Sequence, residues 1–183
     1  MSPAGAHERD GLTSAGRIVP RRELQALGKR LRAQGQRIAF ANGCFDLVHV
    51  GHVRYLEAAR PEGDVLVVGV NGDDAVRTLK GQGRPLLPAG ARAELVAALA
   101  AVDYVVIFDE LNAEAVLTDL CPDVHCKGTD YTEENVPERE VVRRLGGVVR
   151  IVGDAKDHST REMLVEIAGR SGPLKGKGRN ARE

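Results

Sequence analysis

The sequence predicts an α/β protein with a Rossmann-like, doubly wound parallel sheet of about five strands and helices on both faces. Short apolar runs alternate along the chain with segments whose apolar residues recur at helical spacing, and this alternation is typical of right-handed strand-helix-strand crossovers. The run 65–70 is continuously apolar and rich in valine, as expected of a strand buried on both faces. A length of 183 residues with 43% hydrophobic residues fits one globular domain.

The individual elements follow from the same alternation. Pro20 opens a first helix that Gly35 closes, because the leucines between them recur every three or four residues. The apolar run 38–41 predicts a strand, and Asn42 begins the loop after it. The later elements are expected in this order: a helix at 52–60, a strand at 65–70, a helix from Asp73 or Asp74 to Leu79, a helix at 89–101, a strand at 104–108, a helix at 112–120, a strand at 123–126, a helix at 137–145, a strand at 148–152 and a last helix near Ser159 or Thr160.

One domain is expected at residues 18–169, between two tails. Residues 1–17 and 170–183 are rich in glycine and charge and lack an apolar period. Segments of this kind cannot bury enough apolar surface to offset the entropy of ordering. Both are therefore predicted to be disordered, and the C-terminal one is basic.

Composition excludes several classes of partner. The 26 Lys and Arg residues balance 26 Asp and Glu residues, so there is no broad basic field to hold nucleic acid or an anionic membrane. No apolar run approaches the roughly 18 residues that span a bilayer, and residues 1–10 lack the apolar centre of a signal peptide. A cytoplasmic location is expected. The three cysteines suggest neither a disulfide framework nor a zinc site.

The loop after the first strand is the strongest candidate site, because ligands of such sheets bind at the carboxyl ends of the strands. Gly43 and Gly51 allow a ligand to approach the backbone closely. His49 and His52 lie three residues apart, and His52 is expected to open a helix whose free N–H groups favour an anion. Two imidazoles and a helix N-terminus predict a phosphate site.

Other interpretations of this region have less support. Each histidine could simply satisfy a buried hydrogen bond. A metal-dependent nuclease using His49, His52 and Asp46 would need a further carboxylate nearby, and a helix N-terminus repels cations. The chain contains no Walker A motif, and the segment 81–85 lacks the third glycine of a dinucleotide fingerprint.

The loop resembles the H-x-G-H signature of the nucleotidylyltransferase superfamily, in its cytidylyltransferase-like branch. It reads Gly43-Cys44-Phe45-Asp46, followed by His49-x-Gly51-His52. Further motifs come in the order seen in bacterial heptose-1-phosphate adenylyltransferases: Val70-Asn71-Gly72-Asp73, Leu79-Lys80-Gly81 with Arg84-Pro85, Arg92-Ala93-Glu94, Val102-Asp103-Tyr104, Lys127-Gly128-Thr129-Asp130-Tyr131 and Ser159-Thr160. The resemblance covers about residues 18–169. Since no sugar kinase half is present, it is to the stand-alone form.

The resemblance implies transfer of AMP from ATP to D-glycero-β-D-manno-heptose 1-phosphate, giving ADP-heptose and pyrophosphate for lipopolysaccharide or related glycans. It also implies Mg²⁺ carried in with ATP, and a homodimer. A sugar phosphate oxygen is already an anionic nucleophile, so no catalytic triad is required. Two alternatives remain open: a glycerol-3-phosphate-type cytidylyltransferase, and a nucleotide-binding regulatory protein without turnover.

The resemblance further implies the roles of individual residues. His49, His52 and Lys80 are expected to be catalytic. ATP is expected to contact Asn42, Gly43, Cys44, Phe45, Gly51, Arg92, Lys127, Gly128, Asp130, Ser159 and Thr160. The sugar phosphate is expected to contact Asp46, Asn71, Lys80 and Arg84. No protein ligand to a metal ion is expected.

Overall fold

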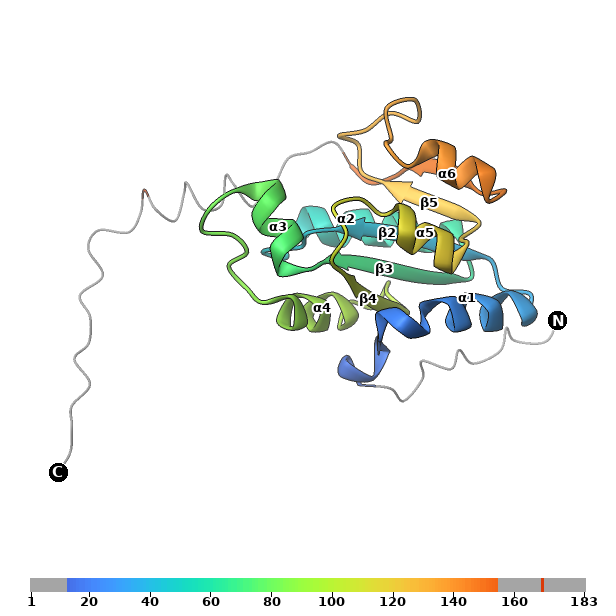
Figure 1. Ribbon diagram of the computed structural model, residues 1–183, viewed down its shortest axis with the longest axis horizontal. Helices are drawn as coiled ribbons and strands as arrows, with labels where there is room; N and C mark the ends of the chain where they lie inside the picture. The colour runs from blue at the N-terminus through green and yellow to red at the C-terminus, as the bar shows by residue number, and fades with distance from the viewer. Residues whose placement is uncertain (1–12, 155–168, 170–183) are drawn as a thin grey trace.

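The structure is a computed structural model that describes residues 13–154 and Gly169. Its centre is a parallel sheet of six strands in the order β1-β4-β3-β2-β5-β6. Helices cover both faces of this sheet (Figure 1). The α/β, Rossmann-like class expected from the sequence is therefore confirmed, with one strand more than expected.

Strands and helices alternate along the chain as the crossovers require. The strands are β1 (Ile18–Val19), β2 (Ile38–Gly43), β3 (Val65–Asn71), β4 (Tyr104–Phe108), β5 (Val124–Lys127) and β6 (Val148–Ile151). The α-helices are α1 (Leu24–Ala33), α2 (Val50–Ala59), α3 (Asp73–Lys80), α4 (Ala89–Ala97), α5 (Glu114–Leu120) and α6 (Arg139–Arg144). Short 3-10 turns are η1 (Ala15–Arg17), η2 (Arg21–Glu23) and η3 (Arg60–Glu62).

Several boundaries differ from the sequence-based expectation. Helix α2 begins at Val50 rather than at His52, because His49 occupies the N-cap position. Gly72, not Asp73 or Asp74, is the N-cap of α3. Helix α4 ends at Ala97, four residues early, where the chain turns toward β4. The helix expected near residue 159 lies outside the described residues.

The sequence predicts disordered tails at residues 1–17 and 170–183. Of these, residues 1–12 and 170–183 lie outside the described residues. The turn η1 and the strand β1 begin at residues 15 and 18, near the expected boundary. Arg17 in this turn donates a hydrogen bond to the Ala97 carbonyl oxygen at 3.1 Å. The short strand β1 then pairs with β4 at one edge of the sheet.

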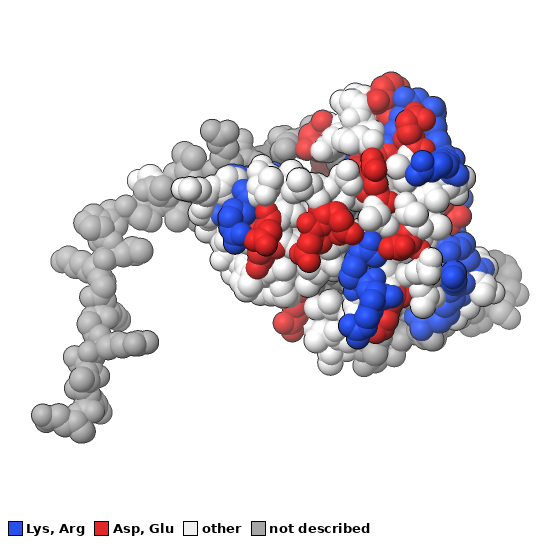
Figure 2. Space-filling model, viewed as in Figure 1, with Lys and Arg blue, Asp and Glu red and all other residues white. Residues whose placement is uncertain are grey.

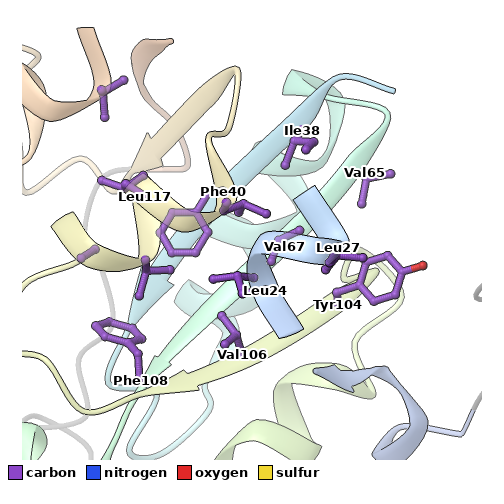
Figure 3. Close-up of a cluster of buried hydrophobic side chains, with 14 of the residues drawn as sticks. Leu24, Leu27, Ile38, Phe40, Val65, Val67, Tyr104, Val106, Phe108 and Leu117 are labelled. Atoms are coloured by element: carbon purple, nitrogen blue, oxygen red, sulfur yellow. The ribbon is translucent and has the colours of Figure 1, made fainter. Parts of the chain in front are cut away.

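Two aliphatic cores lie on opposite faces of the sheet, because side chains alternate along each strand. Ile38 and Phe40 of β2 pack toward α1, α5 and α6, together with Val65, Val67 and Val106 (Figure 3). The residues between them, such as Ala39 and Ala41, pack toward α2 and α4. Burial on both faces explains why the central strands have continuous apolar sequences.

The order of the strands reverses between β2 and β5. The chain passes from β2 to β3 and β4 on one side, and then returns through α5 to β5 and β6 on the other. Such a switch point leaves a crevice outside the carboxyl ends of the two strands, where ligands of open α/β sheets bind. The β2–α2 loop begins at this position, as does the segment after β5.

Among the described residues, no helix is long and apolar enough to cross a membrane. On the face shown in Figure 2, basic and acidic side chains are interspersed rather than separated into regions of one sign. This distribution agrees with the formal net charge of +0. Any polyanionic ligand must therefore be held by a local arrangement of groups.

Candidate active site

The two histidines of the β2–α2 loop lie against each other at the N-terminus of α2. Their rings stack with centroids 3.9 Å apart and an interplanar angle of 28°. The backbone N–H of His49 points at Nδ1 of His52, with an N···N distance of 3.4 Å. Because that nitrogen accepts, the neutral ring of His52 carries its proton on Nε2. The first turn of α2 adds backbone N–H groups and the positive end of the helix dipole.

Phe45 supports this pair from the protein interior. Its side chain is buried, and its ring lies 5.0 Å from the ring of His52, centroid to centroid. Phe45 adopts a positive φ of 48°, which brings its ring over the preceding backbone. A side chain at Gly43 would meet that ring at 3.2 Å. Glycine at this position therefore permits the close packing that orients His52, besides any close approach of a ligand.

Arg92 occupies an unexpected environment. Its side chain is fully buried, and it donates hydrogen bonds to the carbonyl oxygens of Leu87 and Cys44 and to Asp73 Oδ1. The guanidinium thus links α4 to the β2–α2 loop and to the start of α3. Three of the five guanidinium N–H donors thus have protein acceptors, and the contact of Arg92 with ATP stays a prediction.

Asp46 and Arg84 form an ion pair between the β2–α2 loop and the segment before α4. The second oxygen of Asp46 accepts the backbone N–H of Leu86 at 2.6 Å. Asp46 is 5% exposed. The carboxylate of Asp46 therefore holds the side chain of Arg84 against the β2–α2 loop, and the contact of Arg84 with the sugar phosphate stays a prediction. The pair closes the segment 84–88 onto the loop that carries the histidines.

Cys44, Asn71 and Lys80 lie beside this pair. The thiol of Cys44 is 4.0 Å from Oδ1 of Asn71, which is buried at the end of β3. Burial raises the pKa of the Cys44 thiol, while the positive charges of Lys80 and Arg92 oppose that shift. The Lys80 ammonium is thus close enough to act electrostatically on the loop, and its side chain is exposed at the end of α3.

Lys127 joins the ends of the two strands at the switch point. Its Nζ lies 3.1 Å from Oδ1 of Asn42 and 3.2 Å from Oε2 of Glu138. His125 Nε2 lies 3.2 Å from the same Asn42 oxygen. Sequence reasoning named Lys127 and Asn42 but missed Glu138 and His125, since their proximity results from the fold and no local motif indicates it.

The remaining expected ligands lie after β5, in the first turn of α2 or outside the described residues. Gly128 and Asp130 belong to a turn that the Tyr131 N–H closes on the Gly128 carbonyl at 3.0 Å. Gly51 lies in the first turn of α2. Ser159 and Thr160 lie outside the described residues. Within the described part of the chain, no group of three or more His, Cys, Asp or Glu side chains is placed to hold a metal ion.

Comparisons with known proteins point to one family. The cytidylyltransferase-like family matches residues 40–166. The bifunctional protein HldE of Alcanivorax borkumensis is 48% identical over 136 residues, which is 74% of this chain and 29% of that protein. The bifunctional protein HldE of Geotalea uraniireducens is 48% identical over 152 residues, 83% of this chain and 31% of that protein. The chain thus spans less than a third of the length of these relatives.

A solved structure shares the fold. It is described as a lipopolysaccharide core biosynthesis protein from Thermoplasma volcanium GSS1, and it superposes with a TM-score of 0.56 at 28% sequence identity. The match covers 66% of this chain and 99% of that one.

Proposed function

The chain belongs to the cytidylyltransferase-like family, and from this premise we propose that it transfers AMP from ATP to D-glycero-β-D-manno-heptose 1-phosphate, giving ADP-heptose and pyrophosphate. The observation that carries the proposal is the stacked pair His49 and His52 at the N-terminus of α2, beside the switch point of the sheet. The similarity to two HldE proteins and to a protein of lipopolysaccharide core biosynthesis supports the choice of a heptose substrate.

The proposed reaction is a single in-line displacement at phosphorus. An oxygen of the sugar phosphate attacks the α-phosphorus of ATP, a new P–O bond forms, and the bond to the bridging oxygen of pyrophosphate breaks. The attacking oxygen is already anionic, so no general base is needed. The protein's work is to align the two phosphates and to stabilise the charge of the transition state.

The site offers donors suited to this task. Nε2–H of His52 is directed away from the bond that its Nδ1 accepts, and it would donate to an oxygen of the reacting phosphate. The N-terminal turn of α2 would hold the neighbouring phosphates. Lys80, the exposed cation at the end of α3, would reach over both substrates. Loss of one such donor costs on the order of 10²-fold to 10³-fold in kcat.

The buried polar residues would act in two ways: Arg92 and Asp46 position the backbone, whereas Asn71 contacts the sugar phosphate. Arg92 would hold the carbonyl of Cys44 and so fix the loop backbone. Asp46 would hold Arg84 and the Leu86 N–H, which keeps the segment 84–88 against the sugar phosphate side of the site. Asn71, at the end of β3, would meet the sugar phosphate through its side-chain amide.

A divalent ion fits the site as a companion of ATP. Enzymes of this kind typically use such an ion, and Mg²⁺ usually keeps several water ligands and binds nucleotide phosphates. The described residues offer no three-ligand set, so oxygens of the triphosphate would hold Mg²⁺. The ion would neutralise phosphate charge. The chain's own cations and helix N-terminus would orient the complex.

A homodimer completes the proposal, because the resemblance to heptose-1-phosphate adenylyltransferases implies it. The cytoplasmic location expected from the sequence is part of the same proposal. Light scattering on the purified chain tests the oligomer directly. A mass near twice 19.6 kDa is expected, and a monomer mass at micromolar concentration would contradict the dimer.

Pyrophosphate release from a panel of substrates tests the function. ATP and CTP are each combined with heptose 1-phosphate and with glycerol 3-phosphate, in the presence of Mg²⁺. We expect release with ATP and heptose 1-phosphate only. Brisk release with CTP and glycerol 3-phosphate would establish the cytidylyltransferase alternative, and nucleotide binding without release in any combination would establish the regulatory one.

A further inference from the structure

Four polar side chains form a buried cluster at the switch point of the sheet. Asn42 is the penultimate residue of β2, and His125 and Lys127 lie on the neighbouring strand β5. Glu138 comes from the N-cap of α6. The side chains of His125, Lys127 and Glu138 are buried. The strand residues share one face, because side chains two residues apart point to the same side of a strand.

The donors and acceptors of this cluster can be assigned from its chemistry. An ammonium group only donates, so the Asn42 atom at 3.1 Å from Lys127 Nζ must be the carbonyl oxygen. The His125 nitrogen that lies 3.2 Å from the same oxygen must then donate too. His125 is therefore a neutral ring with its proton on Nε2. Consistently, burial and then the Lys127 charge lower the pKa of His125 to about 3.

The same assignment shows what Lys127 does. Its ammonium faces Asn42 and the carboxylate of Glu138, and it lies 5.2 Å from the centre of the Tyr131 ring. With a carboxylate, an amide oxygen and an aromatic face around it, the ammonium is satisfied within the protein. It is therefore poorly placed to be a direct ligand of a phosphate.

Asn42 is the one partly exposed side chain of this cluster. Its oxygen accepts from two donors on β5, and its NH₂ group has no protein partner among the described residues. Asn42 is half-buried and immediately precedes the loop that carries His49 and His52. Two fixed N–H donors at this point match an anionic oxygen of a nucleotide phosphate.

We propose that Glu138 is a positioning residue, which holds Lys127 and thereby fixes the Asn42 amide so that its N–H groups donate to a phosphate oxygen of the bound nucleotide. The inference rests on the proposed function for the nature of the ligand, a nucleoside triphosphate. Glu138 itself touches no substrate. Its removal would leave a buried ammonium without its counter-charge, and Lys127 and Asn42 would leave their present positions.

Titration calorimetry with ATP and Mg²⁺ tests the proposal through Glu138→Ala and Glu138→Gln. We expect Glu138→Ala to weaken nucleotide binding on the order of tenfold, as loss of a hydrogen bond to a charged group does. Glu138→Gln keeps an oxygen for Lys127 and should stay within about threefold of the wild type. The matched control is Glu140→Ala, since Glu140 lies in the same helix with its side chain 82% exposed.

A double variant separates positioning from stability. Asn42→Asp keeps the shape and the oxygen that faces Lys127 but places a second oxygen where the N–H donors were, so it should bind ATP on the order of 10²-fold more weakly. Adding Glu138→Ala to Asn42→Asp should then weaken binding no further, because the two changes act through one group. Full additivity, or a folded Glu138→Ala with unchanged affinity, would overturn the proposal.

The wild-type protein tests the contact between the Asn42 amide and ATP even if the Glu138→Ala variant does not fold. The side-chain NH₂ signal of Asn42, assigned by its loss in Asn42→Asp, should shift in the ¹⁵N NMR spectrum when ATP is added. An unmoved signal in the bound state overturns the positioning role. If the wild type binds CTP rather than ATP, the proposed substrate fails and the same comparisons are made with CTP. If it binds neither, both proposals fail.

Discussion

The imidazole of His52 stacks on that of His49 with ring centroids 3.9 Å apart, and Nδ1 of His52 faces the backbone N–H of His49. The stack fixes the orientation of the His52 ring, and the hydrogen bond to Nδ1 selects the tautomer of that ring. We therefore expect His52 to donate from Nε2 to an oxygen of the reacting phosphate. A donor that is fixed in advance stabilises a transition state more effectively than one that must first be ordered.

Substitution of His52 should reveal this donor. His52→Ala is expected to lower kcat on the order of 10²-fold or more, because a preorganised charge-stabilising group is lost. His52→Gln, whose amide nitrogen lies near the position of Nε2, should lose less. The measurement is pyrophosphate release at saturating ATP and heptose 1-phosphate. Near-normal turnover of His52→Ala would refute the role.

Arg92 is expected to affect stability more than chemistry. Arg92→Leu leaves the Cys44 and Leu87 carbonyls and Asp73 without their donor, and it should lower the free energy of unfolding by about 3 kcal/mol. Arg77→Leu is the matched control, since Arg77 is exposed and paired with Asp74 of its own helix, and it should cost less than about 1 kcal/mol. Urea denaturation measures both. Equal losses would contradict the buried role.

Two glycine substitutions, one in α1 and one in α4, test where helix packing excludes a side chain. A side chain at Gly28 would meet the Leu120 carbonyl oxygen at 2.5 Å, so α1 and α5 would have to separate. Gly28→Ala should destabilise by about 1 to 3 kcal/mol. At Gly90, within α4, nothing lies within 4 Å, and Gly90→Ala should be neutral or stabilising by up to about 1 kcal/mol. Melting temperatures that fall equally would contradict this difference.

Stability should fall in mild acid because of His125. The pKa of His125 is about 3 in the folded protein and has a reference value of 6.5. Between these values the unfolded chain binds a proton that the folded chain does not, so the free energy of unfolding falls as pH drops from about 6.5 toward 3. The slope from this one group is at most about 1.4 kcal/mol per pH unit.

His125→Gln provides the comparison for that prediction. Glutamine can still donate to the oxygen of Asn42 but does not titrate. The pH dependence of unfolding between 6.5 and 3 should therefore be flatter in this variant than in the wild type. Parallel curves would mean that other groups, rather than His125, control the acid transition.

The sequence predicted the features that depend on local pattern. The valine-rich run at β3 and the apolar stripe of α1 identified their elements, and the spacing of His49 and His52 correctly placed both rings near one point. The strand β1 has only two residues and no pattern of its own, so only its pairing with β4 reveals it.

The features that escaped prediction depend on contacts distant in sequence. The sequence shows that Arg92 is charged, but its burial follows from carbonyls 5 and 48 residues away. Likewise, the carboxylate of Glu138 reaches Lys127 only because α6 begins beside the end of β5. Such residues carry no motif, and their functions come from the partners that the fold supplies.

Isotope transfer tests most directly whether this chain transfers AMP from ATP to heptose 1-phosphate. Heptose 1-phosphate labelled with ¹⁸O on its phosphate is turned over with ATP and Mg²⁺, and the products are analysed by ³¹P NMR and mass spectrometry. If the sugar phosphate oxygen attacks the α-phosphorus, all of the label appears in ADP-heptose and none in pyrophosphate. Label released as inorganic phosphate, or no ADP-heptose at all, would contradict adenylyl transfer by this chain.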